Sequence, residues 1–253
     1  MKRTPVVLIH GAWFHLSSWE GWAERFASHG YAVSAPGWPG EDLAADRVRR
    51  KPGPLGDLGL AALTAHYEEI VRSFDNPPVL IGHSVGGLIA QHLLGAGLGR
   101  AAVALAPLPA GSTRRLCFEP LSRTWFRHLV ANAVGEEEAA KLFDRYAVPA
   151  PLRLLADLGL DRTAAGPADT VVDTADPARG PLLLVSGQED RMVPDGATRS
   201  IYKLHGDSSA VTDLKQFADR GHSLVFDSGW RSVADHVLAW LAANGVEAVT
   251  AQD

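Results

Sequence analysis

The chain alternates short apolar runs with longer segments of helical period. The apolar runs are rich in aliphatic and β-branched residues, and they predict β-strands at residues 5–10, 31–35, 79–81, 102–106, 182–186 and 211–217. All but the last are almost continuously apolar, which is typical of parallel strands covered on both faces. Strands that alternate with helices in this way predict an α/β fold with a doubly wound, mostly parallel sheet.

The most clearly marked helix begins near Ser17. The sequence Ser-Ser-Trp-Glu from Ser17 to Glu20 predicts a capping box, in which Ser17 caps the helix and the Glu20 side chain reaches back. The apolar face is expected to carry Trp19, Trp22 and Phe26. Gly30 is expected just beyond the helix end. Further helices are expected at residues 58–74, 87–94 and 230–242.

The alternation stops after residue 107. Amphipathic helical patterns follow at residues 121–134, 136–146 and 151–158, and no strand is expected before about residue 174. Helices inserted between two parallel strands predict a cap over the carboxyl ends of the strands, where open α/β sheets bind ligands. We therefore expect an α/β core (1–107 and 174–253) and a helical cap (108–173). A separate helical domain is the alternative, but so short a segment would bury little core alone.

Composition narrows the class of protein. The 253 residues are 46% hydrophobic and 21% charged, with 24 Lys and Arg against 29 Asp and Glu, a formal charge of −5. Because the sequence contains no basic block, we do not expect nucleic acid or anionic membrane surfaces as partners. The expected partner is a small-molecule substrate. The single cysteine, Cys117, excludes an internal disulfide and a cysteine-based metal site. The oligomeric state cannot be read from the sequence.

Neither a signal peptide nor a membrane span is expected from the apolar runs of the sequence. The first apolar run is too short for the core of a signal peptide, and no run approaches the ~18–20 apolar residues of a membrane span. The cytoplasm is therefore the expected location. Residues 247–253 are expected to be frayed.

The most informative motif is the pentapeptide that runs from Gly82 to Gly86 with Ser84 at its centre, a G-x-S-x-G sequence. It follows an apolar run and precedes a helical one, which is the context of a nucleophile elbow. In such an elbow a sharp turn holds the serine in a strained backbone conformation, and bulk at the flanking positions would collide with neighbouring elements. A glycine-rich turn with an incidental serine is the alternative.

A serine nucleophile needs a base within hydrogen-bond reach and a group that orients the base. His222 follows the last predicted strand and is the expected base. The orienting acid should follow the preceding strand, where Asp190 is the first choice and Glu189 the second. The order Ser84, Asp190, His222 along the chain is the order that accompanies a nucleophile elbow on such a sheet. Individually, each residue could instead be an ordinary loop residue.

Acyl transfer also needs donors for the developing oxyanion. The backbone N–H of Val85, directly after the nucleophile, is one expected donor. The second should come from the loop after the first strand, where Ala12 is the first choice and Trp13 the alternative. His10 and His83 are expected to brace this region rather than to transfer protons. Apolar side chains expected to contact substrate are Trp13, Phe118, Trp125 and Phe126, although the last three also fit the internal packing of a cap.

These motifs together resemble those of the α/β-hydrolase superfamily. The resemblance is carried by residues 6–13, 82–87, 187–194 and 221–223, which extend over nearly the whole chain, and it is strongest for small cap-bearing serine hydrolases of bacteria, of the lysophospholipase-like and esterase type. It implies Ser84 as nucleophile, Asp190 as acid and His222 as base, with Ala12 and Val85 as the oxyanion hole. The chain departs from the pattern at its start, where the antiparallel leading strands of the family are not expected.

The expected activity is hydrolysis of a carboxylic ester, thioester or lactone of a small to medium hydrophobic substrate through an acyl-enzyme. Carbon–carbon bond hydrolysis, acyl transfer and perhydrolysis could use the same triad. A ligand receptor with slow hydrolysis is the alternative outside the enzymes. Metal-binding motifs, a G-x-G-x-x-G sequence and a Walker motif are absent from the sequence, so no metal or cofactor is expected.

Overall fold

The computed structural model describes residues 2–41, 44–51, 57–109, 122–159 and 171–250. Six parallel strands form the central sheet, in the order β3-β2-β4-β5-β6-β7. Their bounds are β2 (Pro5–Ile9), β3 (Ala32–Ser34), β4 (Val79–His83), β5 (Ala101–Leu105), β6 (Leu182–Gly187) and β7 (Thr212–Phe217). The order reverses direction between β2 and β4, as a doubly wound sheet requires. All six predicted strands and the predicted fold class are confirmed.

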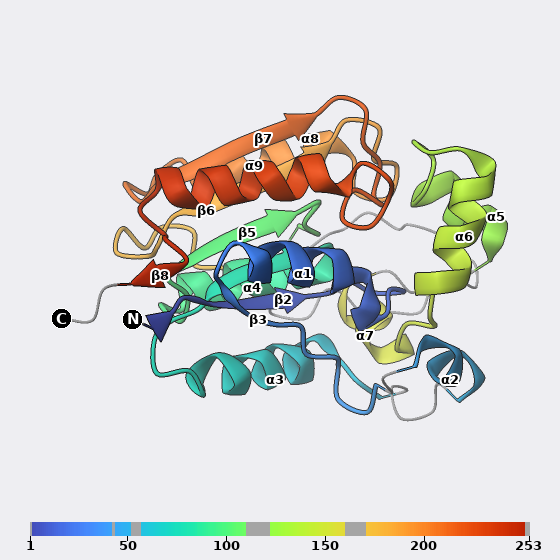
Figure 1. Cartoon of the computed structure of the whole chain (residues 1–253), viewed down its shortest axis with the longest axis horizontal. Coiled ribbons are helices and arrows are strands. Elements are labelled where there is room, and N and C mark those ends of the chain that lie inside the picture. Colours follow the sequence, from blue (N-terminus) through green and yellow to red (C-terminus); the bar gives the residue numbers. More distant parts are fainter. Residues whose placement is uncertain (1, 42–43, 52–56, 110–121, 160–170, 251–253) are drawn as a thin grey trace.

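Helices cover both faces of this sheet. Helix α1 lies beside α9 in front of the sheet in Figure 1, whereas α4 and α8 lie behind it and α3 packs on α4. The bounds of these helices are α1 (Glu20–Ser28), α3 (Leu60–Arg72), α4 (Val85–Gly95), α8 (Asp195–Leu204) and α9 (Trp230–Ala243). Because helices cover both faces, every residue of β2, β4, β5 and β6 is buried, which explains their continuous apolar character.

The predicted capping box at the start of α1 is wrong. A 3₁₀ turn, η1 (Leu16–Trp19), precedes the helix, and the side chain of His15 accepts a hydrogen bond from the Ser17 N–H. Glu20 instead forms an ion pair with Arg145, with 2.6 Å between nitrogen and oxygen. The buried His15 ring thus takes the place of the serine cap. Gly30 follows the helix with φ of 93°, in the left-handed region, as predicted.

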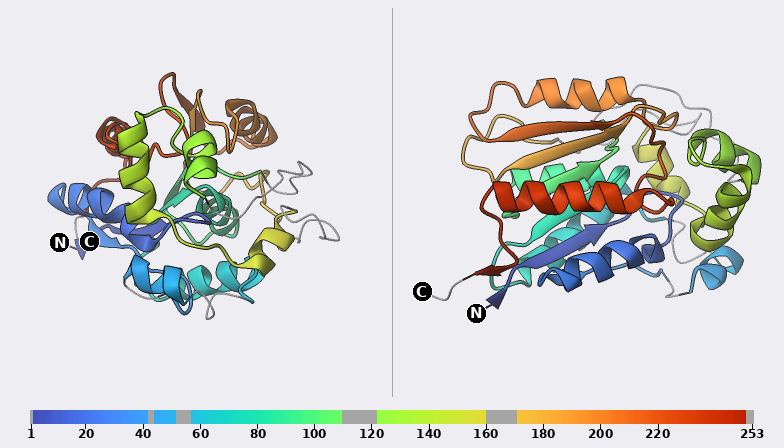
Figure 2. Two further views of the ribbon diagram at one scale, coloured as in Figure 1. Left: turned by 90° about the vertical axis from the view of Figure 1, so that its right-hand side faces the viewer. Right: turned by 45° about the horizontal axis from the view of Figure 1, so that its top comes forward.

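Two helices and a small sheet were not predicted. The helices are α2 (Ala45–Arg50) and α8, each of which buries only one or two side chains. The small sheet pairs β1 (Lys2–Arg3) with β8 (Val249–Thr250) in antiparallel orientation. The chain end was expected to be frayed from residue 247, and this pairing corrects that expectation for residues 249–250. Figure 2 shows the two termini side by side.

Three helices follow β5, where the helical insertion was predicted. They are α5 (Arg123–Leu129), α6 (Glu136–Tyr146) and α7 (Leu152–Asp157). Helices α5 and α6 pack together beyond the carboxyl ends of the strands (Figure 1). Helix α7 is tied to the core because the Asp157 carboxylate accepts a hydrogen bond of 2.9 Å from the first amide of α3, that of Leu60. The edge of the sheet that carries the motifs thus faces these helices.

Candidate active site

Ser84 lies in the sharp turn between β4 and α4. Its φ of 57° and ψ of −119° are rarely adopted by residues with a side chain, so the backbone is strained here. A Cβ on Gly82 would lie 2.0 Å from the Gly86 oxygen, and a Cβ on Gly86 would lie 2.1 Å from the Ile9 oxygen. Both flanking positions therefore require glycine, which is the steric condition for a nucleophile elbow.

His222 and Asp190 are joined by a buried hydrogen bond. The distance from His222 Nδ1 to Asp190 Oδ2 is 2.8 Å, and both side chains are fully buried. The other carboxylate oxygen accepts hydrogen bonds from the amides of Met192 and Val193. Glu189, the second choice for the acid, is exposed. The structure therefore brings His222 together with Asp190.

The hydrogen bond to Asp190 determines how the His222 ring can react. A carboxylate can only accept, so Nδ1 of the ring carries the hydrogen. In the neutral ring Nε2 is then an acceptor. Nε2 is buried and has no hydrogen-bond partner within the described part of the chain. A buried acceptor without a hydrogen-bond partner costs free energy, so its presence in a folded protein calls for a functional explanation. The nitrogen Nε2 is in a position to accept a proton.

The residue before Ser84 is in contact with the loop of His222. Nε2 of His83 donates a hydrogen bond of 2.9 Å to the backbone oxygen of His222, and the two rings lie 4.7 Å apart. Burial lowers the pKa of His83 well below its usual value, and the charge that His222 can carry lowers it further. The neutral His83 ring is therefore a hydrogen-bond donor that connects the elbow to the loop that carries His222.

The loop after β2 passes close to Ser84. A Cβ on Gly11 would lie 2.8 Å from the Ser84 Cβ, so the glycine allows the backbone to approach the elbow. Among the described residues, the amides of Ala12 and Val85 donate no backbone hydrogen bond. Trp13, the alternative donor, has φ of 66°, and its carbonyl oxygen accepts a hydrogen bond from Val148. The Val85 amide thus directly follows the serine, and the Ala12 amide follows the glycine that packs against it.

The residues expected to contact substrate are largely buried in aromatic packing. The rings of Trp13 and Trp125 lie 5.2 Å apart, with both side chains mostly covered. Phe126 is fully buried, with ring distances of 6.4 Å to Phe14 and 5.5 Å to Phe143. Phe118 lies outside the described residues. Contacts with other side chains, including Phe14 and Phe143, thus cover the Phe126 side chain.

Two aromatic residues beside the site were not identified from the sequence. The Phe14 ring stacks on His83 at 5.2 Å and lies 5.9 Å from His222, and Phe226 contacts both Phe14 and His83. Phe14 lies in the loop after β2, and the expectation of an oxyanion donor in that loop already placed it near the candidate site. No local pattern marked Phe226, because its contacts come from parts of the chain distant in sequence.

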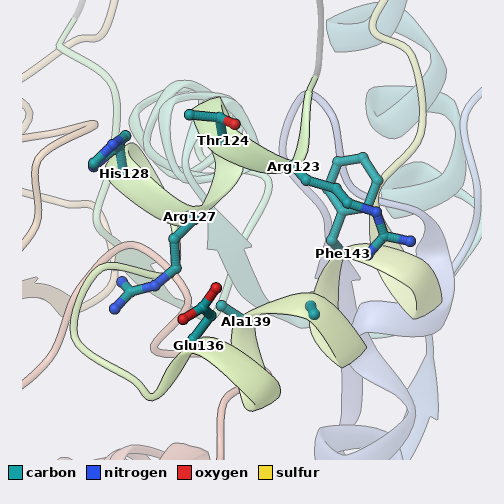
Figure 3. A pocket seen from close by; sticks show the side chains of 8 residues that line it. Arg123, Thr124, Arg127, His128, Glu136, Ala139 and Phe143 are labelled. Atoms are coloured by element: carbon teal, nitrogen blue, oxygen red, sulfur yellow. The ribbon is translucent and has the colours of Figure 1, made fainter.

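A cavity of about 320 Å³ opens between α5 and α6, away from the elbow (Figure 3). Its walls combine cationic, acidic and apolar side chains, and none belongs to the predicted triad. The residues that line it are Arg123, Thr124, Arg127, His128, Glu136, Ala139, Ala140 and Phe143. Arg123 is occupied by an ion pair with Asp144, and Arg127 by the Ala131 oxygen.

The described residues lack both a cluster of metal-binding side chains and a membrane-spanning helix. They contain no group of three or more histidine, cysteine, aspartate or glutamate side chains that could hold a metal ion. No helix in the described ranges has both the length and the apolar character that crossing a bilayer requires.

Solved structures of several enzymes are similar in fold to this chain. A methylesterase from Arabidopsis has 15% identity and a TM-score of 0.64, with 95% of this chain and 99% of that chain covered. A monoacylglycerol lipase from Paleococcus ferrophilus has 19% identity and a TM-score of 0.67, with 95% and 94% covered. Methylketone synthase I from tomato, complexed with 2-tridecanone, has 14% identity and a TM-score of 0.67, with 96% and 100% covered.

At these identities the solved structures establish the fold alone. No curated protein matches this chain. The sequence model of the alpha/beta hydrolase family matches residues 6–236, which include the elbow, both partners of the His222–Asp190 hydrogen bond and the loop after β2. This chain is a member of the alpha/beta hydrolase family.

Proposed function

We propose that this protein is a serine hydrolase that cleaves a carboxylic ester, thioester or lactone through an acyl-enzyme on Ser84. The observation that carries the proposal is the buried hydrogen bond between His222 and Asp190, which leaves Nε2 of the imidazole unpartnered. The contact between His83 and the His222 backbone brings this base to the edge of the sheet where the strained serine lies. Nucleophilic catalysis needs a serine and an oriented base within hydrogen-bond reach of each other, and these features support that arrangement for Ser84 and His222.

In the first half of the reaction, Ser84 Oγ attacks the carbonyl carbon while His222 Nε2 takes the hydroxyl proton. The tetrahedral intermediate collapses, the bond to the leaving alcohol or thiol breaks, and His222 returns the proton to the leaving group. In the second half, a water molecule attacks the acyl-enzyme, gives its proton to His222, and releases the carboxylic acid. Asp190 keeps the ring in the reactive tautomer and stabilises its cation.

The amides of Val85 and Ala12 form the oxyanion hole in this proposal. The Val85 amide is the first of α4, so the positive end of the helix dipole adds to its hydrogen bond. The Ala12 amide is unused by other backbone groups and follows Gly11, which packs against the serine. Donors fixed in advance at the developing charge need no reorganisation when the intermediate forms.

Residues 108–173 act as a cap over the site in this proposal. Support comes from α5 and α6, which lie beyond the carboxyl ends of the strands (Figure 1). The paired rings of Trp13 and Trp125 join the loop after β2 to α5, and they favour a hydrophobic acyl group at their junction. The names of the similar structures, a methylesterase and a lipase, agree with an ester as the substrate.

The test is a screen of p-nitrophenyl esters from acetate to laurate, together with lactones and acyl thioesters, against the wild type and Ser84→Ala. We expect multiple turnovers with at least one ester and a loss of about 10⁶ in kcat for the variant. Ser186→Ala is the matched control, because Ser186 is also buried but donates to Asp195. A Ser84→Ala variant that retained more than a few per cent of the rate would refute the assignment.

Labelling with a fluorophosphonate separates an enzyme from a receptor. An enzyme is expected to react at Ser84 and, without the label, to turn over many ester molecules per site. Modification of Ser84 by an ester with no further turnover, or stabilisation by a ligand that is never cleaved, would instead indicate a receptor. The same label should leave Ser84→Ala unmodified.

A further inference from the structure

Outside the proposed triad, one buried carboxylate stands out. The side chain of Glu41 is only 1% exposed, although it lies in the irregular segment between β3 and α2. Its Oε2 accepts hydrogen bonds from Nε2 of His10 at 3.0 Å and from the amide of Trp38 at 2.9 Å. Its Oε1 accepts a hydrogen bond from the amide of Leu16 at 3.2 Å and lies 3.8 Å from Nε2 of His15. Buried carboxylates are rare unless they are paired in this way.

These contacts hold both ends of one loop. The loop after β2 begins at His10 and ends at Leu16, and the two oxygens of Glu41 bind one group at each end. Ala12, the proposed oxyanion donor, lies between them. The ring of Trp38 stacks on His10 at 4.6 Å and covers the same contact. A single carboxylate therefore closes this loop on the side that faces residues 36–41.

The opposite side of the loop is held by the chain that follows α6. The carbonyl of Trp13 accepts a hydrogen bond of 2.9 Å from Val148, and the amide of His15 donates one of 2.9 Å to the Tyr146 carbonyl. Trp13 has φ of 66°, a conformation that a tryptophan adopts only when its surroundings hold it. The loop is thus fixed from two sides, and on one of them Glu41 holds both loop ends by side-chain hydrogen bonds.

Electrostatics agree with a carboxylate that remains charged. Burial by itself would raise the pKa of Glu41, but attraction to His10 and the hydrogen bonds from His10 and Trp38 outweigh it and lower the pKa. A charged acceptor forms stronger hydrogen bonds than a neutral one. The loop ends are therefore bound by charge-assisted contacts.

We propose that Glu41 is a positioning residue for the oxyanion hole: by binding both ends of the loop from His10 to Leu16, it fixes the Ala12 amide relative to Ser84. This inference rests on the proposed function. An oxyanion donor must lie within about 2.7–3.1 Å of the charge that develops, so a small displacement of the loop weakens the transition state more than the substrate complex. Glu41 contacts neither the substrate nor the reacting atoms in this arrangement.

The test compares Glu41→Ala and Glu41→Gln with the wild type on the best p-nitrophenyl ester, at a temperature where circular dichroism shows each variant to be folded. We expect kcat to fall about 10- to 100-fold in Glu41→Ala, with KM changed by less than about threefold, because removal of one oxyanion donor costs roughly 10²–10³ in kcat. Glu41→Gln retains the shape and one acceptor oxygen, so it should recover part of the loss.

A second measurement reports on the oxyanion hole directly. A trifluoromethyl ketone forms a tetrahedral adduct with the serine and places an oxyanion in the hole, whereas the corresponding secondary alcohol does not. We expect the inhibition constant of the ketone to rise by about the same factor as kcat falls, and that of the alcohol to stay within about threefold. A residue needed only for stability would change neither constant in the folded variant.

Arg179→Gln is the matched control, because Arg179 is also buried and hydrogen-bonded but precedes β6 at the opposite edge of the sheet. It should lower the melting temperature and leave kcat unchanged. Unchanged kcat in both folded Glu41 variants, or a rise in KM alone, would overturn the proposal for Glu41. If Glu41→Ala does not fold, Glu41→Gln decides by the same criteria.

Failure of the proposed function gives a different result. Activity that survives in Ser84→Ala would refute the serine mechanism and, with it, any oxyanion hole for Glu41 to position. Activity that depends on Ser84 but not on Glu41 would refute only the role of Glu41.

Discussion

The ring of His83 donates a hydrogen bond of 2.9 Å to the backbone carbonyl of His222. His83 directly precedes the strained Ser84, so this contact joins the elbow to the loop that carries the base, across 139 residues of sequence. Phe14 stacks on the His83 ring and lies near the His222 ring as well. The two loops are thereby held together independently of any bond between Ser84 and His222 themselves.

Replacement of His83 by alanine should slow the reaction without changing how its rate depends on pH. A neutral hydrogen bond contributes about 1 kcal/mol, which corresponds to roughly fivefold in rate if the base is displaced. Burial lowers the pKa of His83, so the ring stays neutral where the enzyme works and adds no ionisation to the profile. The measurement is kcat/KM against pH. His83→Gln, which keeps an N–H donor, should retain more activity, and an alanine variant as active as the wild type would exclude the bracing role.

Asp190→Asn should lose about 10⁴ in kcat and still fold. The amide can present its NH₂ group to His222 Nδ1, which stabilises the wrong tautomer and leaves Nε2 protonated. The neighbouring Glu189 is exposed, so Glu189→Gln is the matched control and should be close to wild type. The measurement is kcat on the best ester, with circular dichroism to establish folding. Loss of activity in the glutamine variant alone would exchange the roles of the two carboxylates.

Gly86→Ala should destabilise the protein by about 3 kcal/mol or more, because the new Cβ would lie 2.1 Å from the Ile9 oxygen at the carboxyl end of β2. All the nearest atoms are backbone atoms of Ile9 and His10, which cannot move aside as the end of a side chain could. Gly135→Ala meets open space at the start of α6 and should cost less than about 1 kcal/mol. Urea denaturation followed by circular dichroism measures both. Equal stability of the two variants would contradict the steric account of the elbow.

Stability should fall as the pH drops below about 6.5, in part because of His205. Burial lowers its pKa from 6.5 to about 4, with a further contribution from the charge of Arg179. Between about pH 4 and pH 6.5, His205 therefore binds a proton in the unfolded chain but not in the folded chain. The stabilisation is complete above pH 6.5 and is lost as the pH falls to about 4, by at most about 3 kcal/mol.

The measurement is the free energy of unfolding in urea at several pH values between about 4 and 8. His205→Asn removes the titrating ring but keeps an acceptor for Arg179, which donates to His205 Nδ1. The variant should therefore show a shallower decline than the wild type in this range. The buried His83 ring acts in the same direction, so some decline should persist. Parallel curves for the two proteins would rule out His205 as a contributor.

Local patterns predicted the framework of the fold and the residues proposed for the triad. Almost continuous apolar runs identified five of the six strands of the main sheet, and only β7 was predicted from a run that contains several polar residues. The elbow could be recognised because its steric demands fall on neighbouring residues, Gly82 and Gly86. Position along the chain indicated the turn that carries both Asp190 and Glu189, and the buried hydrogen bond of Asp190 to His222 favours the first choice.

Other features depend on contacts between distant segments, and no local pattern reveals them. The sequence suggested Ser17 as the cap of the first helix, but the buried ring of His15 takes that place. Three further features are of the same kind: the pairing of residues 2–3 with 249–250, the packing of Phe226 on Phe14 and His83, and the hydrogen bonds from Glu41 to both ends of the loop after β2. The chain alone therefore determined which chemical groups are available and on which strand ends they lie. Tertiary packing decided which of them are buried, oriented and charged, because burial and hydrogen bonding arise only when segments far apart in sequence meet.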